Sequence, residues 1–180
     1  MLLTIALGVS PAASAYISQT SSARVGTSAD EQALGVARMV GGIISYSRWP
    51  GRDGGVTVCT MGTTRFAGRI GEADAAAGRP VTARSIAPGS SAAAQGCDLL
   101  YLGGTTPAQR QKAIGAIHGQ PVLSIAENDP DCRGGTMFCV VLTGNTLTFR
   151  LNVDAISRGT VRVDPRVLRL FDEAPDRTAA

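Results

Sequence analysis

The sequence predicts a single α/β domain with a central, mostly parallel sheet flanked by helices and an antiparallel C-terminal hairpin on the sheet. Three observations predict this class. Short β-branched or apolar segments alternate with helical segments between residues 29 and 127. Two of the strand segments are almost continuously apolar, which is typical of strands buried on both faces of a sheet. After residue 127 the pattern changes to two neighbouring strands around a tight-turn signal.

The first helix is predicted from a capping box followed by an apolar stripe. Ser28 and Glu31 form an S-x-x-E pattern, which satisfies free N–H groups at a helix start. Apolar residues then recur at helical spacing up to Trp49-Pro50, where the helix must end because proline disfavours helix in the residue before it. The β-branched segment 56–61 follows as the first strand.

The remaining elements are predicted from the same signals. The alternating part continues with a helix over 63–78, a strand over 81–86, a strand over 98–102, a helix over 106–119 and a strand over 121–126. Residues 87–96 fit either a loop or a short helix. The closing part comprises hairpin strands 137–142 and 147–151 at the sheet edge, around Gly144-Asn145, and helical segments 154–158 and 165–171.

The N-terminus carries the pattern of an export signal. An apolar run over 2–9 is followed by the small-x-small sequence Ala13-Ser14-Ala15, at which a signal peptidase could cut before Tyr16. The alternative is a frayed apolar N-terminus. The chain is therefore expected to divide into a signal peptide, 1–15, a Ser/Thr-rich linker, 16–28, the domain, 29–173, and a disordered tail, 174–180.

The cysteines favour an oxidising compartment. The chain has Cys59, Cys97, Cys132 and Cys139, and it contains no C-x-x-C pair of the kind used by redox and zinc sites. Two disulfides are the natural expectation outside the cytosol. Four cysteines allow three connectivities, and pairing in sequence order joins Cys59 to Cys97 and Cys132 to Cys139. The alternative is four buried free thiols in a cytosolic protein.

The composition argues against several function classes. The net charge of +3 comes almost entirely from arginine, and no short window is rich in Lys or Arg, so no nucleic-acid footprint is predicted. His118 is the only histidine, which excludes a multi-histidine metal site, and its place at a predicted helix end favours a surface role. Nucleotide-binding and nucleophile-elbow motifs are absent. We therefore predict no catalytic residue, no metal and no cofactor.

Two segments have the position or the composition of a ligand site, but neither has the residue spacing of a ligand-binding motif. Gly62-Thr63-Thr64 follows a strand, where α/β sheets place ligands, but an ordinary turn is the simpler interpretation. Glu127, Asp129 and Asp131 alternate before Cys132, yet they lack the spacing of a calcium loop. A solvated turn is expected there.

Several motifs occur together in a characteristic order. Trp49-Pro50 follows the first helix, and later motifs are CDLLYL at 97–102, the Gly134-Gly135 loop, LTFRLN at 147–152 and VLRL at 167–170. In this combination the chain resembles the YfiR-like family of periplasmic proteins over about residues 30–171. The paired cysteines fit the same pattern.

The resemblance implies regulation rather than catalysis. It implies a periplasmic negative regulator that binds the periplasmic sensor region of a membrane-bound diguanylate cyclase and lowers cyclic-di-GMP signalling, and with it biofilm formation. It also implies a homodimer and an outer-membrane lipoprotein that sequesters the regulator. The expected partner-binding residues are Trp49, Gly134 and Gly135, although Trp49 fits the core as well. The alternative from another class is a small solute-binding sensory module that uses the crevice at the strand ends.

Overall fold

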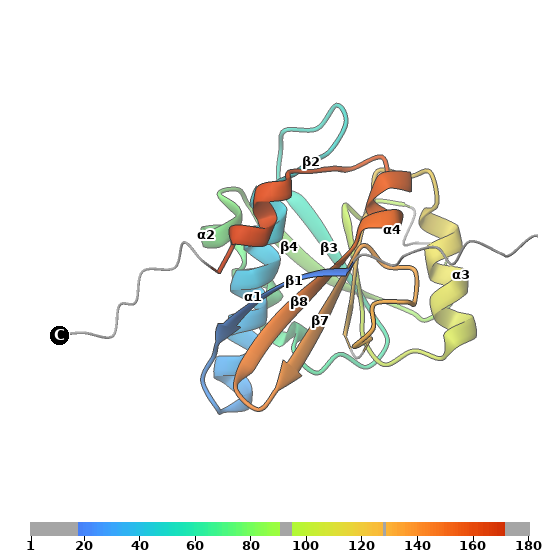
Figure 1. The fold of residues 1–180 in the computed structure, drawn as a ribbon. Coiled ribbons are helices and arrows are strands. Elements are labelled where there is room, and N and C mark those ends of the chain that lie inside the picture. The colour runs from blue at the N-terminus through green and yellow to red at the C-terminus, as the bar shows by residue number, and fades with distance from the viewer. Residues whose placement is uncertain (1–17, 91–94, 128, 172–180) are drawn as a thin grey trace, which may run out of the picture.

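The main sheet of the computed structural model has seven strands in the order β1-β8-β7-β6-β5-β3-β4 (Figure 1). The structure describes residues 18–90, 95–127 and 129–171. The strands from β7 to β4 are parallel, whereas β8 is antiparallel to both β7 and β1. The predicted class, a mostly parallel α/β sheet with an antiparallel hairpin, is confirmed.

The elements have the following bounds. The sheet strands are β1 (Ser18–Arg24), β3 (Val56–Met61), β4 (Val81–Ile86), β5 (Leu99–Leu102), β6 (Leu123–Glu127), β7 (Phe138–Thr143) and β8 (Thr146–Asn152). Strands β2 (Ser47–Arg48) and β9 (Arg162–Val163) pair in a small separate sheet. The α-helices are α1 (Ala29–Ser45), α2 (Asp74–Ala77), α3 (Pro107–Ile117) and α4 (Val153–Arg158), and the 3₁₀ helices are η1 (Ala67–Glu72) and η3 (Pro165–Arg169).

Alternation along the strands divides the core into two layers. Leu99 and Tyr101 belong to the core layer that includes α1, while Leu100 and Leu102 belong to the smaller layer that includes α3. This pattern explains why the segment is apolar at every position. The predicted capping box of α1 is present, with the Oγ of Ser28 accepting a hydrogen bond from the backbone N of Glu31 at 3.2 Å.

The linker prediction is wrong for residues 18–24. These residues form β1, which pairs with β8 over seven residues, so the sheet begins well before residue 29 and β1, not the hairpin, is its edge. Ser21 lies opposite Phe149 and is buried. Small polar residues suit an edge strand, because one of its sides faces water. The predicted signal peptide and the tail 174–180 lie outside the described residues.

Smaller differences affect two of the predicted helices. The segment 63–78 folds as η1 followed by α2, and it ends as predicted at Gly78, which has a φ of 66°. The segment 165–171 forms only the short 3₁₀ helix η3.

Removing β1 should destabilise the domain. A chain that begins at Val25 exposes the edge of β8 and part of the core behind Phe149, so its free energy of unfolding should fall by more than about 2 kcal/mol. Urea denaturation measures this change, and a chain that begins at Ser18 is the matched control. Equal stability of the two chains would show that residues 18–24 are the linker that the sequence predicted.

Candidate functional site

The carboxyl ends of β3 and β5 form the topological switch point of the sheet, where α/β proteins commonly hold ligands. Here the two loops pair with each other. The backbone N of Thr63 donates to the carbonyl O of Gly104 at 3.3 Å, and the N of Gly104 donates to the O of Thr63 at 2.7 Å. A Cβ on Gly103 would lie 2.4 Å from the Thr63 oxygen. Backbone therefore joins the two loops at the switch point, and an open hollow remains beside them, lined by Gly62, Thr63, Gly104 and Gln109 among others.

The hydrogen-bonding groups at the N-terminus of α3 are also paired within the chain itself. The Oγ1 of Thr106 accepts a hydrogen bond from the backbone N of Gln109 at 3.2 Å, and the Oε1 of Gln109 accepts one from the N of Thr106 at 2.9 Å. Pro107, at the first helical position, has no N–H to offer. This helix start therefore presents few free donors to an anion.

Glu127 connects three segments at the same end of the sheet. Its carboxylate is buried and accepts hydrogen bonds from the backbone N of Arg65 at 2.8 Å, the backbone N of Phe66 at 2.9 Å and the hydroxyl of Tyr101 at 2.7 Å. Burial, together with this neighbouring carboxylate, raises the pKa of the Tyr101 phenol well above its ordinary value. The expectation of a solvated turn is therefore wrong for Glu127, because its carboxylate holds the loop after β3 in place.

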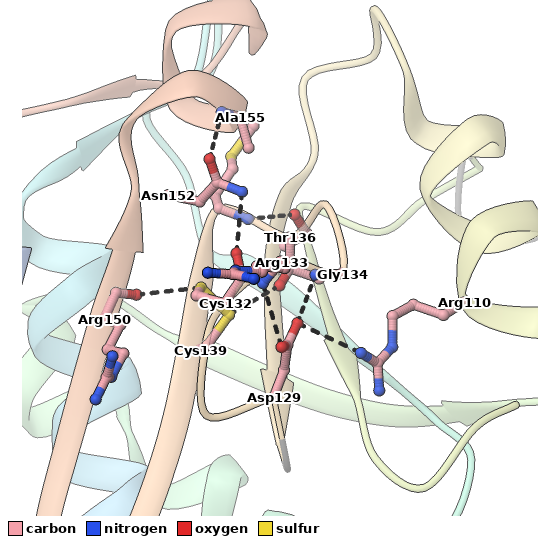
Figure 2. The surroundings of a disulfide bond; sticks show 12 residues. Arg110, Asp129, Cys132, Arg133, Gly134, Thr136, Cys139, Arg150, Asn152 and Ala155 are labelled. Carbon is pink, nitrogen blue, oxygen red and sulfur yellow. Dashed lines mark hydrogen bonds and ion pairs between the residues drawn. A yellow bond between two sulfur atoms is a disulfide. The ribbon is translucent and has the colours of Figure 1, made fainter. Parts of the chain in front are cut away.

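A second braced loop joins β6 to β7 (Figure 2). Cys132 and Cys139 are disulfide-bonded, with their Cα atoms 5.5 Å apart. The buried carboxylate of Asp129 accepts hydrogen bonds from the backbone N of Arg133 at 3.2 Å and of Gly134 at 2.7 Å, and Arg110 of α3 approaches it to 3.3 Å. Asp129 is thus a structural residue of the loop, contrary to the prediction of a solvated turn.

Asn152 holds this loop from the opposite side. Its Nδ2 donates to the carbonyl O of Cys132 at 3.3 Å, and its Oδ1 accepts a hydrogen bond from the backbone N of Ala155 at 3.0 Å, at the start of α4. A Cβ on Gly134 would lie 2.6 Å from both Arg110 and Asp129. A Cβ at this predicted partner-binding position would therefore displace the side-chain ends of Arg110 and Asp129, which gives the glycine a packing role.

The second disulfide stabilises the sheet itself. Cys59 of β3 is bonded to Cys97, just before β5, with a Cα distance of 5.7 Å, and both residues are buried in the layer under α3. The structure thus contains both bonds expected from pairing in sequence order, and none of the cysteines is free.

Trp49 lies in the core. The sequence was compatible with this position and with a partner-binding surface. Its side chain is buried, and its Nε1 donates to the carbonyl O of Asp98 at 2.9 Å. The carboxylate of Asp98 accepts a hydrogen bond from the backbone N of Thr57 at 2.8 Å and pairs with Arg52. The indole therefore offers little surface to a partner, whereas its neighbour Arg48 is exposed.

The small sheet next to Trp49 carries an unusual pair of like charges. Arg48 and Arg162 lie directly opposite each other on β2 and β9, and both are exposed. Like charges in this arrangement repel. Arg48 donates to the carbonyl oxygens of Ser45 at 2.8 Å and Ser47 at 3.0 Å, near the negative end of α1. The side chain of Arg162 has no hydrogen bond or ion pair to any described residue. We call these two side chains the basic ridge.

Two shallow grooves border the basic ridge, and both arginines line each of them. Val163, Asp164 and Arg166 lie in one groove, and the rim of Trp49 with Pro50 lies in the other. Hydrogen bonds from Arg166 lower the pKa of Asp164 to about 2. The ridge could not be predicted, since nothing in the sequence indicates that residues 48 and 162 face each other.

The described residues contain no cluster of three His, Cys, Asp or Glu side chains that could hold a metal ion. Among the same residues, no helix combines the length and the apolar character needed to cross a membrane.

Comparison with known proteins identifies a family. A family described as YfiR/HmsC-like matches residues 35–171 of the chain, a range that extends from within α1 to the end of the described residues.

Solved structures show a similar fold at low sequence identity. Aspartate aminotransferase of subgroup IV from Thermus thermophilus is 14% identical, with a TM-score of 0.50, over 87% of this chain and 48% of that one. YbdL from Escherichia coli, described as a methionine aminotransferase, is 10% identical, with a TM-score of 0.48, over 77% of this chain and 43% of that one. The chain spans less than half the length of these enzymes, and the likeness concerns the fold alone.

The two disulfides should contribute unequally to stability. Replacing Cys59 and Cys97 together by serine should cost about 4 kcal/mol, and replacing Cys132 and Cys139 together should cost about 2.5 kcal/mol, because a longer closed loop restricts the unfolded chain more. Urea denaturation of the oxidised proteins measures both losses. Equal losses, or a larger loss for the shorter loop, would contradict this ranking.

Gly134→Ala should destabilise the protein by about 1–3 kcal/mol, because its Cβ would collide with Arg110 and Asp129. The matched control is Gly115→Ala in α3, where a Cβ meets no atom within 4 Å, and this change should stabilise the protein by about 0.5–1 kcal/mol. Thermal unfolding of both variants checks the opposite signs. A neutral Gly134→Ala would show that the loop can shift freely.

Proposed function

The chain belongs to the YfiR/HmsC-like family, and on this premise we propose that it is a periplasmic negative regulator of a membrane-bound diguanylate cyclase. It binds the periplasmic sensor region of the cyclase and lowers cyclic-di-GMP signalling, and thereby biofilm formation. The observation that carries the proposal is the pairing of Thr63 with Gly104, which joins the two loops at the switch point and leaves only an open hollow beside them. The exposed surface is then the place left for recognition, and its natural ligand is another protein.

The braced loops support this assignment. Disulfides persist in oxidising compartments such as the periplasm. The Cys132–Cys139 bond, together with the hydrogen bonds of Asp129 and Asn152, holds its loop in one arrangement before any partner binds. A preorganised surface loses less conformational entropy on binding, so this rigidity favours a protein-binding role.

We place the partner contact at the basic ridge and its two grooves. Arg48 and Arg162 are exposed side by side, and a partner with complementary negative charge would relieve their repulsion. The Gly134-Gly135 loop, expected from the sequence to bind a partner, is partly exposed and provides a second contact region. A homodimer and a sequestering outer-membrane lipoprotein complete the proposed set of partners.

Charge reversal at the ridge tests both the partner and its location. The oxidised protein is titrated against the purified periplasmic region of the cyclase, and cellular cyclic-di-GMP is measured in parallel. Arg162→Glu should weaken binding at least tenfold and raise cyclic-di-GMP, because it replaces attraction by repulsion. Arg38→Glu is the matched control, since Arg38 is exposed on α1 away from the ridge.

The outcomes separate the two parts of the proposal. Equal affinities of the Arg162 and Arg38 variants would refute the location while leaving the function intact. Absence of binding by the unsubstituted protein would refute the function. If that protein instead showed a higher melting temperature in a small-molecule extract of the periplasm, the solute-sensing alternative would be supported.

A further inference from the structure

Strand β4 forms the other edge of the seven-stranded sheet, and its outer side pairs with no described strand. Its one neighbour in the sheet order is β3, with which it pairs in parallel register. Residues 82–85, the centre of the strand, are all exposed. Because alternate side chains point to opposite faces of a sheet, this strand meets solvent on both faces.

A hydrogen bond at the start of β4 shows which of its backbone groups are free. The backbone N of Val56 donates to the carbonyl O of Pro80 at 2.8 Å, so Pro80 faces β3. The N–H and C=O groups of one strand residue point to the same side, and the side changes at each residue. Val81, Ala83 and Ser85 therefore direct these groups away from β3. None of the groups has a hydrogen bond to a described residue.

Strand β4 lacks most of the features that protect an edge strand from pairing with another chain. Such features are very short length, proline, bulges and charged side chains, lysine above all. The strand has six residues without proline, and its register with β3 is unbroken. Its one charged side chain is Arg84, whose guanidinium donates to the carbonyl O of Gln95 at 2.9 Å. The edge is therefore open to a further strand.

The sequence of β4 is complementary to itself about Ala83. Two residues that lie directly opposite each other in an antiparallel pair can exchange both of their hydrogen bonds. A two-fold axis at Ala83 sets this residue opposite its own copy and sets Val81 opposite Ser85, so that all the outward N–H and C=O groups of the strand are paired. The same register sets Arg84 opposite Thr82. An axis at Arg84 would instead bring like charges face to face.

We propose that two copies of the chain pair antiparallel through β4, with the two-fold axis at Ala83, and so form one continuous sheet. The homodimer is part of the proposed function and rests on it, whereas the location of the contact rests on β4. No residue of β4 lines the two grooves at the basic ridge, so the dimer contact and the cyclase contact use different residues. Stable interfaces bury roughly 1,200–2,000 Å² in total, more than two short strands provide, so the dimer should dissociate on dilution.

Sedimentation velocity of the oxidised protein over a hundredfold range of concentration tests the contact. The unsubstituted protein should pass reversibly from monomer to dimer. Ala83→Lys should weaken the dimer at least tenfold, because two ammonium groups would then oppose each other at the axis. Ala108→Lys is the matched control, since it adds the same charge at an exposed position of α3 and should leave the dimer unchanged.

Ala83→Pro tests the direction of the free N–H group. Proline is tolerated in an edge strand where the missing N–H faces water, so the variant should keep the melting temperature of the parent protein within a few degrees and should not dimerise. A large fall in the melting temperature would show that the N–H of Ala83 faces β3, and this would overturn the inference.

Cysteine cross-linking tests the register. Ala83→Cys should form a disulfide-linked dimer on oxidation with copper phenanthroline, because opposed residues that share hydrogen bonds have Cα atoms about 5.5 Å apart. Ser85→Cys is the matched control and should not cross-link. Its copy would lie four residues further along the strand, roughly 13 Å away.

Three outcomes would overturn the inference. The first is a protein that remains monomeric over the whole range of concentration. The second is equal dimerisation of the Ala83→Lys and Ala108→Lys variants, and the third is cross-linking of Ser85→Cys in place of Ala83→Cys. Loss of cyclase binding by Ala83→Pro, when the parent protein is monomeric, would assign the edge to an extended segment of the cyclase.

Titration against the periplasmic region of the cyclase separates this inference from the proposed function. Cyclase binding by a protein that does not dimerise through β4 would refute the contact and leave the function intact. Dimerisation through β4 without any cyclase binding would support the contact and refute the function.

Discussion

The carboxylate of Glu127 is the interaction on which the arrangement of the strand ends depends. It is buried, and three hydrogen-bond donors satisfy its two oxygens there. Two of these are backbone N–H groups of the loop after β3, and the third is the hydroxyl of Tyr101 on β5. With the loop held in this way, Thr63 can pair with Gly104, and the loops after β3 and β5 are joined.

The same principle organises the other loops. Asp129 satisfies two backbone N–H groups of the disulfide loop and Asn152 satisfies a backbone carbonyl of that loop, so the loop is fixed by a covalent bond and by polar side chains on both sides. Asp98 binds the backbone of Thr57 in a similar way. These buried carboxylates and Asn152 thus serve the architecture, whereas the two arginines of the basic ridge are exposed.

Much of the fold could be predicted from local signals. The capping box at Ser28, the apolar strands and the Gly144 turn act over a few residues, and the structure confirms these elements. Strand β1 could not be predicted in this way, because its Ser/Thr-rich sequence becomes a strand only beside β8. Two further features could not be predicted for the same reason: the burial of Glu127, and the pairing of Arg48 with Arg162 across β2 and β9. Both arise from contacts between residues that are distant in sequence.

The pairing of β1 with β8 also constrains the order in which the chain can fold. The first strand of the sheet finds its partner only after β8 has been synthesised, near the C-terminal end of the chain. Until then the growing polypeptide carries an unpaired strand, and the sheet cannot be completed. Its high contact order therefore makes the final closure a late and comparatively slow event, available only to the nearly finished polypeptide.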